Sequence, residues 1–122
     1  MNILHIDDSP EICRLYADMF TLDNHTIEGI HDGKEGLAMV IKNDYDLILL
    51  DICMPKYSGM DFLRDLEKQR SSELKKVVVT SVLQFNETQT LELLKFGIHS
   101  VEEKPSDIQQ LETLQKNMEL VT

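Results

Sequence analysis

The sequence predicts an α/β fold in which helices cover both faces of a doubly wound, five-stranded parallel sheet. Short apolar segments alternate with amphipathic helical patterns along all 122 residues, and this alternation is typical of strand–helix units. The segment at residues 47–50 is apolar at every position, as expected of a central strand that is buried on both faces. Capping residues and glycines separate the segments and divide the chain into five units.

The first two units cover the first third of the chain. Residues 3–6 form the first predicted strand, after which Ser9 supplies an N-cap and Pro10 the first helical residue. Apolar residues recur at helical spacing in the segment that follows, at Ile12, Leu15, Tyr16, Met19 and Phe20. Thr26–Ile30 is a weaker second strand, and an Asp-Gly pair at residues 32–33 turns the chain into the second helix. That helix carries Leu37, Ala38 and Ile41.

The third and fourth units begin with the most apolar strands. After the strand at residues 47–50, Ser58 and Gly59 open a helix with Phe62, Leu63 and Leu66. Residues 77–80 form the fourth strand. Asn86 with Gln89 resembles a capping box for the next helix, and Gly97 is a suitable helix stop. We expect this helix to carry Leu91 and Leu94 toward the core.

The fifth unit completes a single domain over residues 1–122. A short strand near residues 99–103 precedes a final helix at residues 106–120, which Ser106 and Gln109 can cap. Its apolar residues are Ile108, Leu111, Leu114 and Met118. Right-handed crossovers leave few topologies for five parallel strands, and we predict the order 2-1-3-4-5. No effector domain is expected.

Composition limits the classes of partner. Acidic residues outnumber basic residues by 22 to 12, a formal net charge of −10, which disfavours direct binding to nucleic acid or to an anionic membrane. No apolar stretch approaches the ~20 residues of a membrane span, and the N-terminus lacks the basic region of a signal peptide. We interpret Cys13 and Cys53 as reduced thiols and expect a soluble cytoplasmic protein without membrane insertion.

The carboxyl ends of four predicted strands deliver polar residues to one edge of the sheet. These residues are Asp7, Asp8, Asp51, Thr80, Ser81 and Lys104. In the predicted topology they converge at the switch point between the first and third strands, where ligands bind. Two carboxylates about 4 Å apart repel by about 4 kcal/mol at an effective dielectric constant of 20. One divalent cation together with Lys104 would neutralise three carboxylates.

The chemistry of this cluster favours a magnesium-dependent phosphoryl transfer. Oxygen ligands suit Mg²⁺ rather than zinc. A carboxylate beside Mg²⁺ and a lysine can act as a nucleophile toward a phosphoryl group. Lys104 would neutralise charge on the transferring oxygens, and Thr80 could donate a hydrogen bond to one of them.

These motifs together resemble the receiver domain of two-component response regulators. The likeness spans essentially the whole chain: ILHIDDSP at residues 3–10, DICMP at 51–55, SGM at 58–60, then Thr80-Ser81 and Lys104-Pro105. The resemblance implies a flavodoxin-like (βα)5 fold and a stand-alone, CheY-like receiver that works in phosphorelay signalling. Such a domain is not a conventional enzyme, although it promotes its own phosphoryl transfer and hydrolysis.

The resemblance also implies a role for each residue of the cluster. Asp51 would accept the phosphoryl group from a sensor histidine kinase, a phosphotransfer protein or a small phosphodonor. Thr80 and Lys104 would hold the phosphoryl oxygens, and Lys104–Pro105 would be a cis peptide. The implied ligands of Mg²⁺ (or Mn²⁺) are Asp8, Asp51, the backbone carbonyl of Cys53 and, mainly through water, Asp7.

Output is expected through protein contacts with an unknown downstream target. The family's usual signalling surface is the last strand with its flanking helices, where Phe85 and Leu93 are candidate exposed apolar residues unless they pack in the core. Val101 stands where the family usually has an aromatic switch, which puts the usual threonine-to-aromatic coupling in question. Glu102 and Glu103 either protect an edge strand by charge or form a salt-bridged partner surface.

Other interpretations remain for single residues and for the whole chain. His5 is expected to be a hydrogen-bonded core histidine rather than a ligand. Cys53 and Val82 cannot orient a water molecule well, so we predict slow self-dephosphorylation; a redox role for Cys53 is the competing idea. The main alternative function is a receiver-like interaction module that is never phosphorylated. A dinucleotide-binding enzyme is excluded because the required glycine-rich loop is missing after the first strand.

Overall fold

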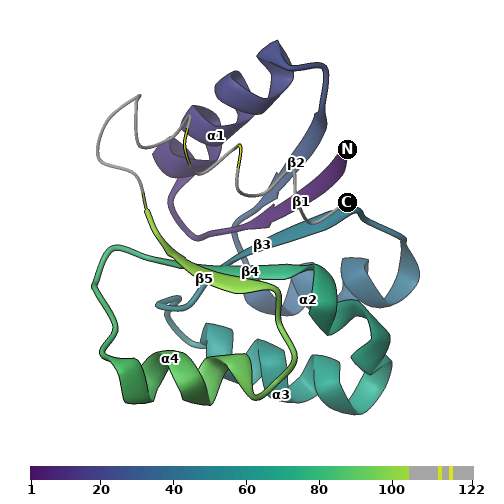
Figure 1. Cartoon of the computed structure of the whole chain (residues 1–122). Coiled ribbons are helices and arrows are strands. Elements are labelled where there is room, and N and C mark those ends of the chain that lie inside the picture. Colours follow the sequence, from purple (N-terminus) through teal and green to yellow (C-terminus); the bar gives the residue numbers. More distant parts are fainter. Residues whose placement is uncertain (105–112, 114–115, 117–122) are drawn as a thin grey trace.

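Five parallel strands form one sheet in the order β2-β1-β3-β4-β5. This computed structural model describes residues 1–104, 113 and 116 (Figure 1). The strands are β1 (Asn2–Ile6), β2 (Thr26–Ile30), β3 (Leu47–Asp51), β4 (Val77–Ser81) and β5 (Ser100–Glu103). The predicted strands and their order are confirmed. The final helix predicted for residues 106–120 and the Lys104–Pro105 peptide bond lie outside the described residues.

Four α-helices and one 3₁₀ helix connect the strands in the described part of the chain. They are α1 (Pro10–Leu22), α2 (Gly33–Lys42), α3 (Gly59–Arg70), η1 (Ser71–Lys76) and α4 (Glu87–Leu94). The predicted helix starts are confirmed by their caps. The Ser9 side chain accepts a hydrogen bond from the Ile12 N–H, and Asn86 forms a complete capping box with Gln89. These caps place the helix N-termini close after the carboxyl ends of the strands.

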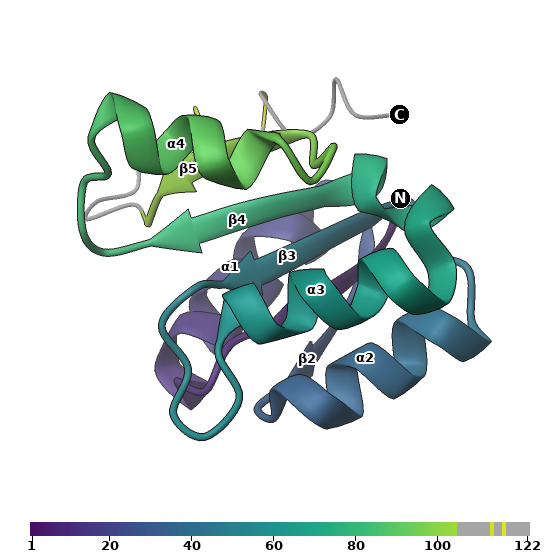
Figure 2. The ribbon, with the colours of Figure 1, turned by 90° about the horizontal axis from the view of Figure 1, so that it is seen from below.

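The sheet separates two apolar layers. On the face that α1 covers, Tyr16 and Phe20 pack against residues of β1, β3 and β4. On the other face, α2, α3 and α4 pack over a larger cluster that includes Phe62 and Leu66 (Figure 2). Every residue of β3 is buried, which confirms its predicted position at the centre of the sheet.

Three predicted helix faces differ from the structure. On α2, Ala38 is exposed, whereas Val40 is buried in the core. On α1, Cys13 is buried while Leu15 is 43% exposed. On α4, Leu93 packs in the core at 4% exposure, whereas Leu91 is 53% and Leu94 38% exposed. The prediction that Leu91 and Leu94 face inward is therefore wrong, and of the two possibilities left open for Leu93, packing in the core is the one observed. Phe85 is partly buried against the core cluster.

The 3₁₀ helix η1 was not predicted, and it contains a buried carboxylate. Glu73 is only 4% exposed and pairs with Arg70 at 2.9 Å and with Lys76 at 2.6 Å. Arg70 also donates hydrogen bonds to the carbonyls of Val40 and Asn43 at the end of α2. This polar network joins the end of α3 to the end of α2 and fixes the approach to β4.

Candidate functional site

Three carboxylates meet at the carboxyl ends of the two central strands. Asp7 and Asp8 follow β1, and Asp51 is the last residue of the adjacent strand β3. One carboxylate oxygen from each of the three lies within 4.8 Å of the others. Asp7 and Asp51 are buried and Asp8 is exposed, so the cluster has two inner acids and one that faces solvent. The predicted convergence of the three acids is confirmed.

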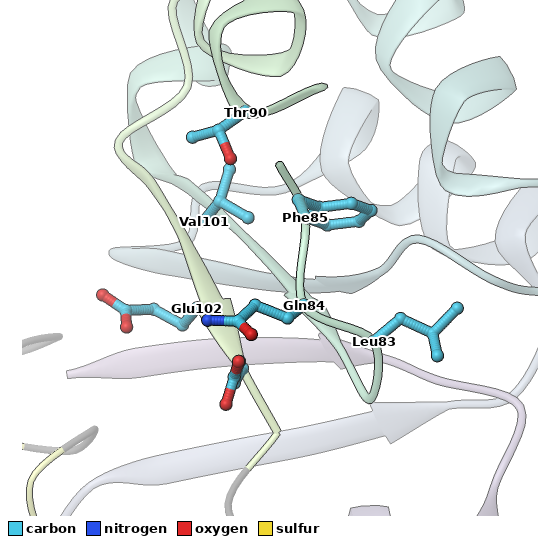
Figure 3. Close-up of a pocket in the computed structure, with 7 residues that line it drawn as sticks. Leu83, Gln84, Phe85, Thr90, Val101 and Glu102 are labelled. Carbon is cyan, nitrogen blue, oxygen red and sulfur yellow. The ribbon is translucent and has the colours of Figure 1, made fainter. Parts of the chain in front are cut away.

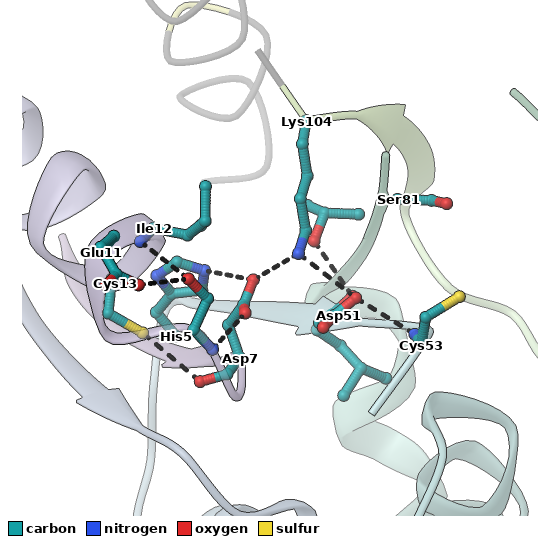
Figure 4. Close-up of polar contacts among 12 residues, drawn as sticks. His5, Asp7, Glu11, Ile12, Cys13, Asp51, Cys53, Ser81 and Lys104 are labelled. Carbon is teal, nitrogen blue, oxygen red and sulfur yellow. Dashed lines mark hydrogen bonds and ion pairs between the residues drawn. The ribbon is translucent and has the colours of Figure 1, made fainter. Parts of the chain in front are cut away.

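Lys104 adds a positive charge to the cluster from the end of the edge strand β5. It follows β5, and its N–H donates a hydrogen bond to the Ser81 carbonyl at the end of β4. Its Nζ lies 2.7 Å from Asp7 Oδ2 and 3.4 Å from Asp51 Oδ1. Figure 4 shows the ammonium group between the two carboxylates. The lysine therefore links the edge strand to both inner acids.

Asp51 and Lys104 each alter the pKa of the other. Burial raises the pKa of Asp51, and the nearby Asp7 charge adds to this rise, while the Cys53 N–H and Lys104 oppose it. For Lys104, burial lowers the pKa, but the ion pairs with Asp7 and Asp51 outweigh burial, so the pKa rises overall. The lysine is thus held in its charged form beside the acids.

The loop after Asp51 is packed closely against the start of α3. The Cys53 N–H donates to Asp51 Oδ1 at 3.1 Å, and the Gly59 N–H donates to the Ile52 carbonyl at 3.0 Å. A Cβ on Gly59 would lie 2.7 Å from Ile52 Cα and 2.9 Å from the Asp51 carbonyl oxygen. Only glycine allows this approach without displacement of the backbone. The packing therefore holds the Asp51 backbone in position.

Thr80 lies beside Asp51 in the sheet register. Its side chain is fully buried, and its hydroxyl donates to the Leu50 carbonyl at 3.4 Å, a long hydrogen bond. The neighbouring Ser81 hydroxyl accepts a hydrogen bond from the Leu83 N–H. The Cys53 thiol is exposed next to Asp51. The predicted site residues are thus gathered at one edge of the sheet.

Three contacts that hold Asp7 in place, from His31, Cys13 and Ser9, were not predicted. The Asp7 carbonyl oxygen lies 3.1 Å from His31 Nδ1 and accepts from the Cys13 thiol at 3.6 Å. The Asp7 carboxylate accepts from the Ser9 N–H at 2.9 Å. His31 follows β2, so its contact with the Asp7 carbonyl requires that β2 lie beside β1. The order of the strands is the only signal in the sequence that could have revealed it.

The chain matches the family model described as "Response regulator receiver domain" over residues 3–116. The chain belongs to this receiver domain family. Receiver domains act in two-component signalling, where phosphorylation on aspartate and Mg²⁺ binding at an acidic pocket are family properties, and response regulators interact with histidine kinases or phosphotransfer partners. In this chain, a cluster of three aspartates with Lys104 lies at the carboxyl ends of β1, β3 and β5.

Named relatives and solved structures agree with the family assignment. The response regulators ArlR of Staphylococcus haemolyticus and Staphylococcus aureus are each 27% identical to the receiver domain, over 90% and 89% of its length. The matches cover 48% of each relative, so the chain spans about half the length of these curated proteins. The expectation of a single-domain protein stays a prediction.

The structural neighbours are also receiver domains. The receiver domain of Francisella response regulator 1452 superposes with a TM-score of 0.84 at 27% identity, covering 98% of this chain and 94% of that one. Chemotaxis protein CheY4 of Vibrio cholerae superposes with a TM-score of 0.83 at 24% identity, over 99% and 98% of the two chains. These matches confirm the flavodoxin-like fold.

Magnesium fits the acids of this receiver domain. Mg²⁺ takes oxygen ligands at about 2.1 Å, so two ligands on opposite sides of one ion lie about 4.2 Å apart. This is the largest separation that two ligands of one ion can have, and the three carboxylate oxygens, within 4.8 Å of one another, are gathered close to it. The exposed Asp8 leaves one side open to the waters that Mg²⁺ retains.

His5 is buried in the receiver domain without the predicted hydrogen bond. Its ring stacks on Tyr16 with centroids 4.5 Å apart, and within the described residues neither ring nitrogen has a hydrogen-bond partner. Its Nε2 lies 3.8 Å from Asp7 Oδ2, too far for a hydrogen bond. Burial lowers the pKa of His5 to about 4. The core location is therefore confirmed, but the predicted hydrogen bond is wrong.

Helix length bears on membrane association. Among residues 1–104, 113 and 116, no helical segment combines the length and the apolar character that crossing a bilayer requires.

Proposed function

We propose that this receiver domain accepts a phosphoryl group on Asp51 in a magnesium-dependent reaction and signals through protein contacts of the surface around α4 and β5. The observation that supports this most directly is the placement of Lys104 Nζ between Asp7 and Asp51, two acids that Asp8 joins in one cluster. A site with three acids and one cation needs one further divalent charge for neutrality. The same charges then suit an incoming phosphoryl group.

Asp51 is the best placed nucleophile of the three acids. Both contacts of its carboxylate within the described residues go to Oδ1, from the Cys53 N–H and from Lys104, which leaves Oδ2 to react. Oδ2 attacks phosphorus, and an O–P bond forms while the N–P bond to the donor's phosphohistidine breaks. The departing imidazole keeps the bonding electron pair and takes a proton from solvent. Asp7 is a poorer nucleophile because Ser9 and Lys104 already engage its carboxylate.

The other residues of the site would bind Mg²⁺ and orient the phosphoryl group. Asp8, Asp51 and the Cys53 carbonyl would hold Mg²⁺, with Asp7 acting mainly through water, and the ion would neutralise charge on the phosphoryl oxygens. Lys104 is close enough to Asp51 to pair with a phosphoryl oxygen. Thr80 can exchange its long hydrogen bond to Leu50 for a shorter one to another phosphoryl oxygen.

Intact mass spectrometry after treatment with acetyl phosphate and Mg²⁺ tests this function. We expect one phosphoryl adduct on the wild-type protein and none on Asp51→Asn. Asp18→Asn, which removes an exposed acid of α1, is the matched control and should keep the adduct. A wild-type protein that stays unmodified with acetyl phosphate and with a phosphohistidine donor would refute the proposal and favour the unphosphorylated interaction module.

A further inference from the structure

Exposed apolar side chains lie on and beside α4. Leu91 and Leu94 project from this helix at 53% and 38% exposure. Together with Thr88, Glu92 and Lys95 they line a shallow hollow of about 410 Å³. Because the buried face of the helix is formed by Leu93 alone, Leu91 and Leu94 are not needed for the core. They are available for contact with another molecule.

A second, smaller hollow lies between the loop before α4 and β5. Its volume is about 140 Å³, and its apolar lining comes from Leu83, Phe85 and Val101. Figure 3 shows Thr90, Val101 and Phe85 around one end and Gln84 with Glu102 toward the other. A cavity of about 150 Å³ holds one benzene-sized group. The hollow therefore has room for one side chain of a partner.

The charge of the smaller hollow determines which kind of partner side chain it can bind. Glu102 and Glu103 line the smaller hollow, and among the described residues its lining contains no lysine, arginine or histidine. The next residue, Lys104, is engaged by Asp7 and Asp51, so it does not neutralise them. Burial raises the pKa of Glu102, and the nearby His99 opposes this rise only in part.

The acidic excess extends along the rest of this surface. Glu87 and Glu92 are exposed on α4, where Lys95 is the nearby exposed cation. A second copy of this chain would bring like charges together, and each copy carries a formal net charge of −10. Self-association through this surface is therefore disfavoured.

We infer that the α4–β5 surface binds a basic, leucine-rich segment of a partner protein. One arginine or lysine of that segment enters the hollow, with its stem against Phe85 and Val101 and its charge beside Glu102 and Glu103. Apolar side chains of the same segment cover Leu91 and Leu94. This inference rests on the proposed function, because it specifies the kind of protein that the signalling surface takes.

Titration with a synthetic peptide tests the inference. The probe is a 15-residue peptide of leucine and arginine, and its match has every arginine replaced by citrulline, which keeps the shape and removes the charge. Binding is followed by amide chemical shifts of the ¹⁵N-labelled receiver domain. We expect shifts centred on Leu83, Leu91 and Val101 with the arginine peptide and much weaker binding of the citrulline peptide.

Paired variants separate this surface from the general acidity of the chain. Glu102→Gln with Glu103→Gln should weaken binding about fivefold, which corresponds to two partly exposed ion pairs. Leu91→Ser should weaken it about tenfold through lost apolar burial. The controls remove the same groups elsewhere: Glu28→Gln with Glu35→Gln, and Leu22→Ser, which is 79% exposed on α1. Control variants that weaken binding as much as the surface variants would overturn the inference.

The same samples keep the two proposals distinguishable. Intact mass reports the phosphoryl adduct, and the titration is run with and without acetyl phosphate and Mg²⁺. An adduct combined with equal effects of surface and control variants would refute the binding inference and leave phosphorylation intact. Variant-sensitive binding without an adduct, from acetyl phosphate or from a phosphohistidine donor, would support the inference and refute phosphorylation.

Discussion

Lys104 Nζ lies 2.7 Å from Asp7 Oδ2, and this contact joins the end of β5 to the end of β1 across two intervening strands. Among the described residues, Lys104 is the lysine that contacts both inner acids, Asp7 and Asp51. A divalent ion and Lys104 therefore act on the same carboxylates. Both neutralise the acids, which leads to the first prediction, and each repels the other, which leads to the second.

Mg²⁺ should raise the melting temperature of the protein. The ion binds the folded acidic cluster and not the unfolded chain, so at ten times its Kd it adds about 1.4 kcal/mol of stability. For a domain of this size that corresponds to a rise of about 5 °C. Differential scanning calorimetry at constant ionic strength measures it, with Asp8→Asn as the variant that should lose the effect. An equal rise in Asp8→Asn would contradict a site at these acids.

Lys104→Ala should bind Mg²⁺ more tightly but accept a phosphoryl group more slowly. Removal of one positive charge beside the three carboxylates lowers the repulsion felt by the ion, which we expect to raise affinity about tenfold. The variant also lacks the ammonium group that pairs with the phosphoryl oxygens. Isothermal titration measures the affinity, and the rate of adduct formation measures transfer. Lys42→Ala, at the exposed end of α2, should change neither.

Phosphorylated Asp51 should lose its phosphoryl group slowly, and Cys53→Asn should accelerate the loss. The exposed Cys53 thiol and the Val82 side chain, 72% exposed, cannot hold a water molecule in line with phosphorus, whereas an amide can. Decay of the adduct by intact mass gives both rates. Rapid wild-type decay that Cys53→Asn leaves unchanged is the result that would rule this out.

Stability should fall as pH decreases from about 6.5 to about 4 because of His5. The folded protein binds a proton there only near pH 4, against 6.5 for the ordinary residue. The unfolded chain therefore binds more protons between these values, and the linked loss amounts to about 3 kcal/mol. Urea denaturation across this range measures it. His5→Phe, which keeps a ring on Tyr16, should show a shallower pH dependence, and an unchanged slope would contradict the assignment to His5.

Gly59→Ala should destabilise the fold and disturb the phosphorylation site. The added Cβ would press on Ile52 Cα and the Asp51 carbonyl, and overpacking of this kind costs about 2 kcal/mol. We expect a lower melting temperature and weaker Mg²⁺ binding. Gln69→Ala, at an exposed position of the same helix, is the control and should be close to neutral. A Gly59→Ala protein as stable as this control would show that the contact can relax.

Features that depend on local chemistry were predictable from the sequence. The caps at Ser9 and Asn86 act within three residues, and the apolar β3 segment indicates its own central position. The convergence of Asp7, Asp8 and Asp51 follows from parallel strands that end at one edge. Topology alone was enough for this part of the site.

Features that depend on the reach of side chains or on short elements were not predictable. α4 has only eight residues, so its two turns cannot show by periodicity whether Leu91 and Leu94 or Leu93 faces inward. The predicted strand order places His31 near Asp7, but the contact of His31 Nδ1 with the Asp7 carbonyl also depends on how far the His31 side chain reaches. The missing hydrogen bond of His5 depends on its distance from Asp7, which no sequence pattern encodes.

The single buried leucine of α4 has a consequence for the dynamics of the fold. Burial of one leucine side chain contributes about 2 kcal/mol, well below the 5–15 kcal/mol that typically separates folded from unfolded domains. The helix can therefore detach in a partial unfolding event while the sheet stays intact, and its amides should exchange with deuterium long before those of β3. A small free energy is enough to change the balance between the attached and detached states of α4. The position of this helix can therefore change while the rest of the domain stays folded.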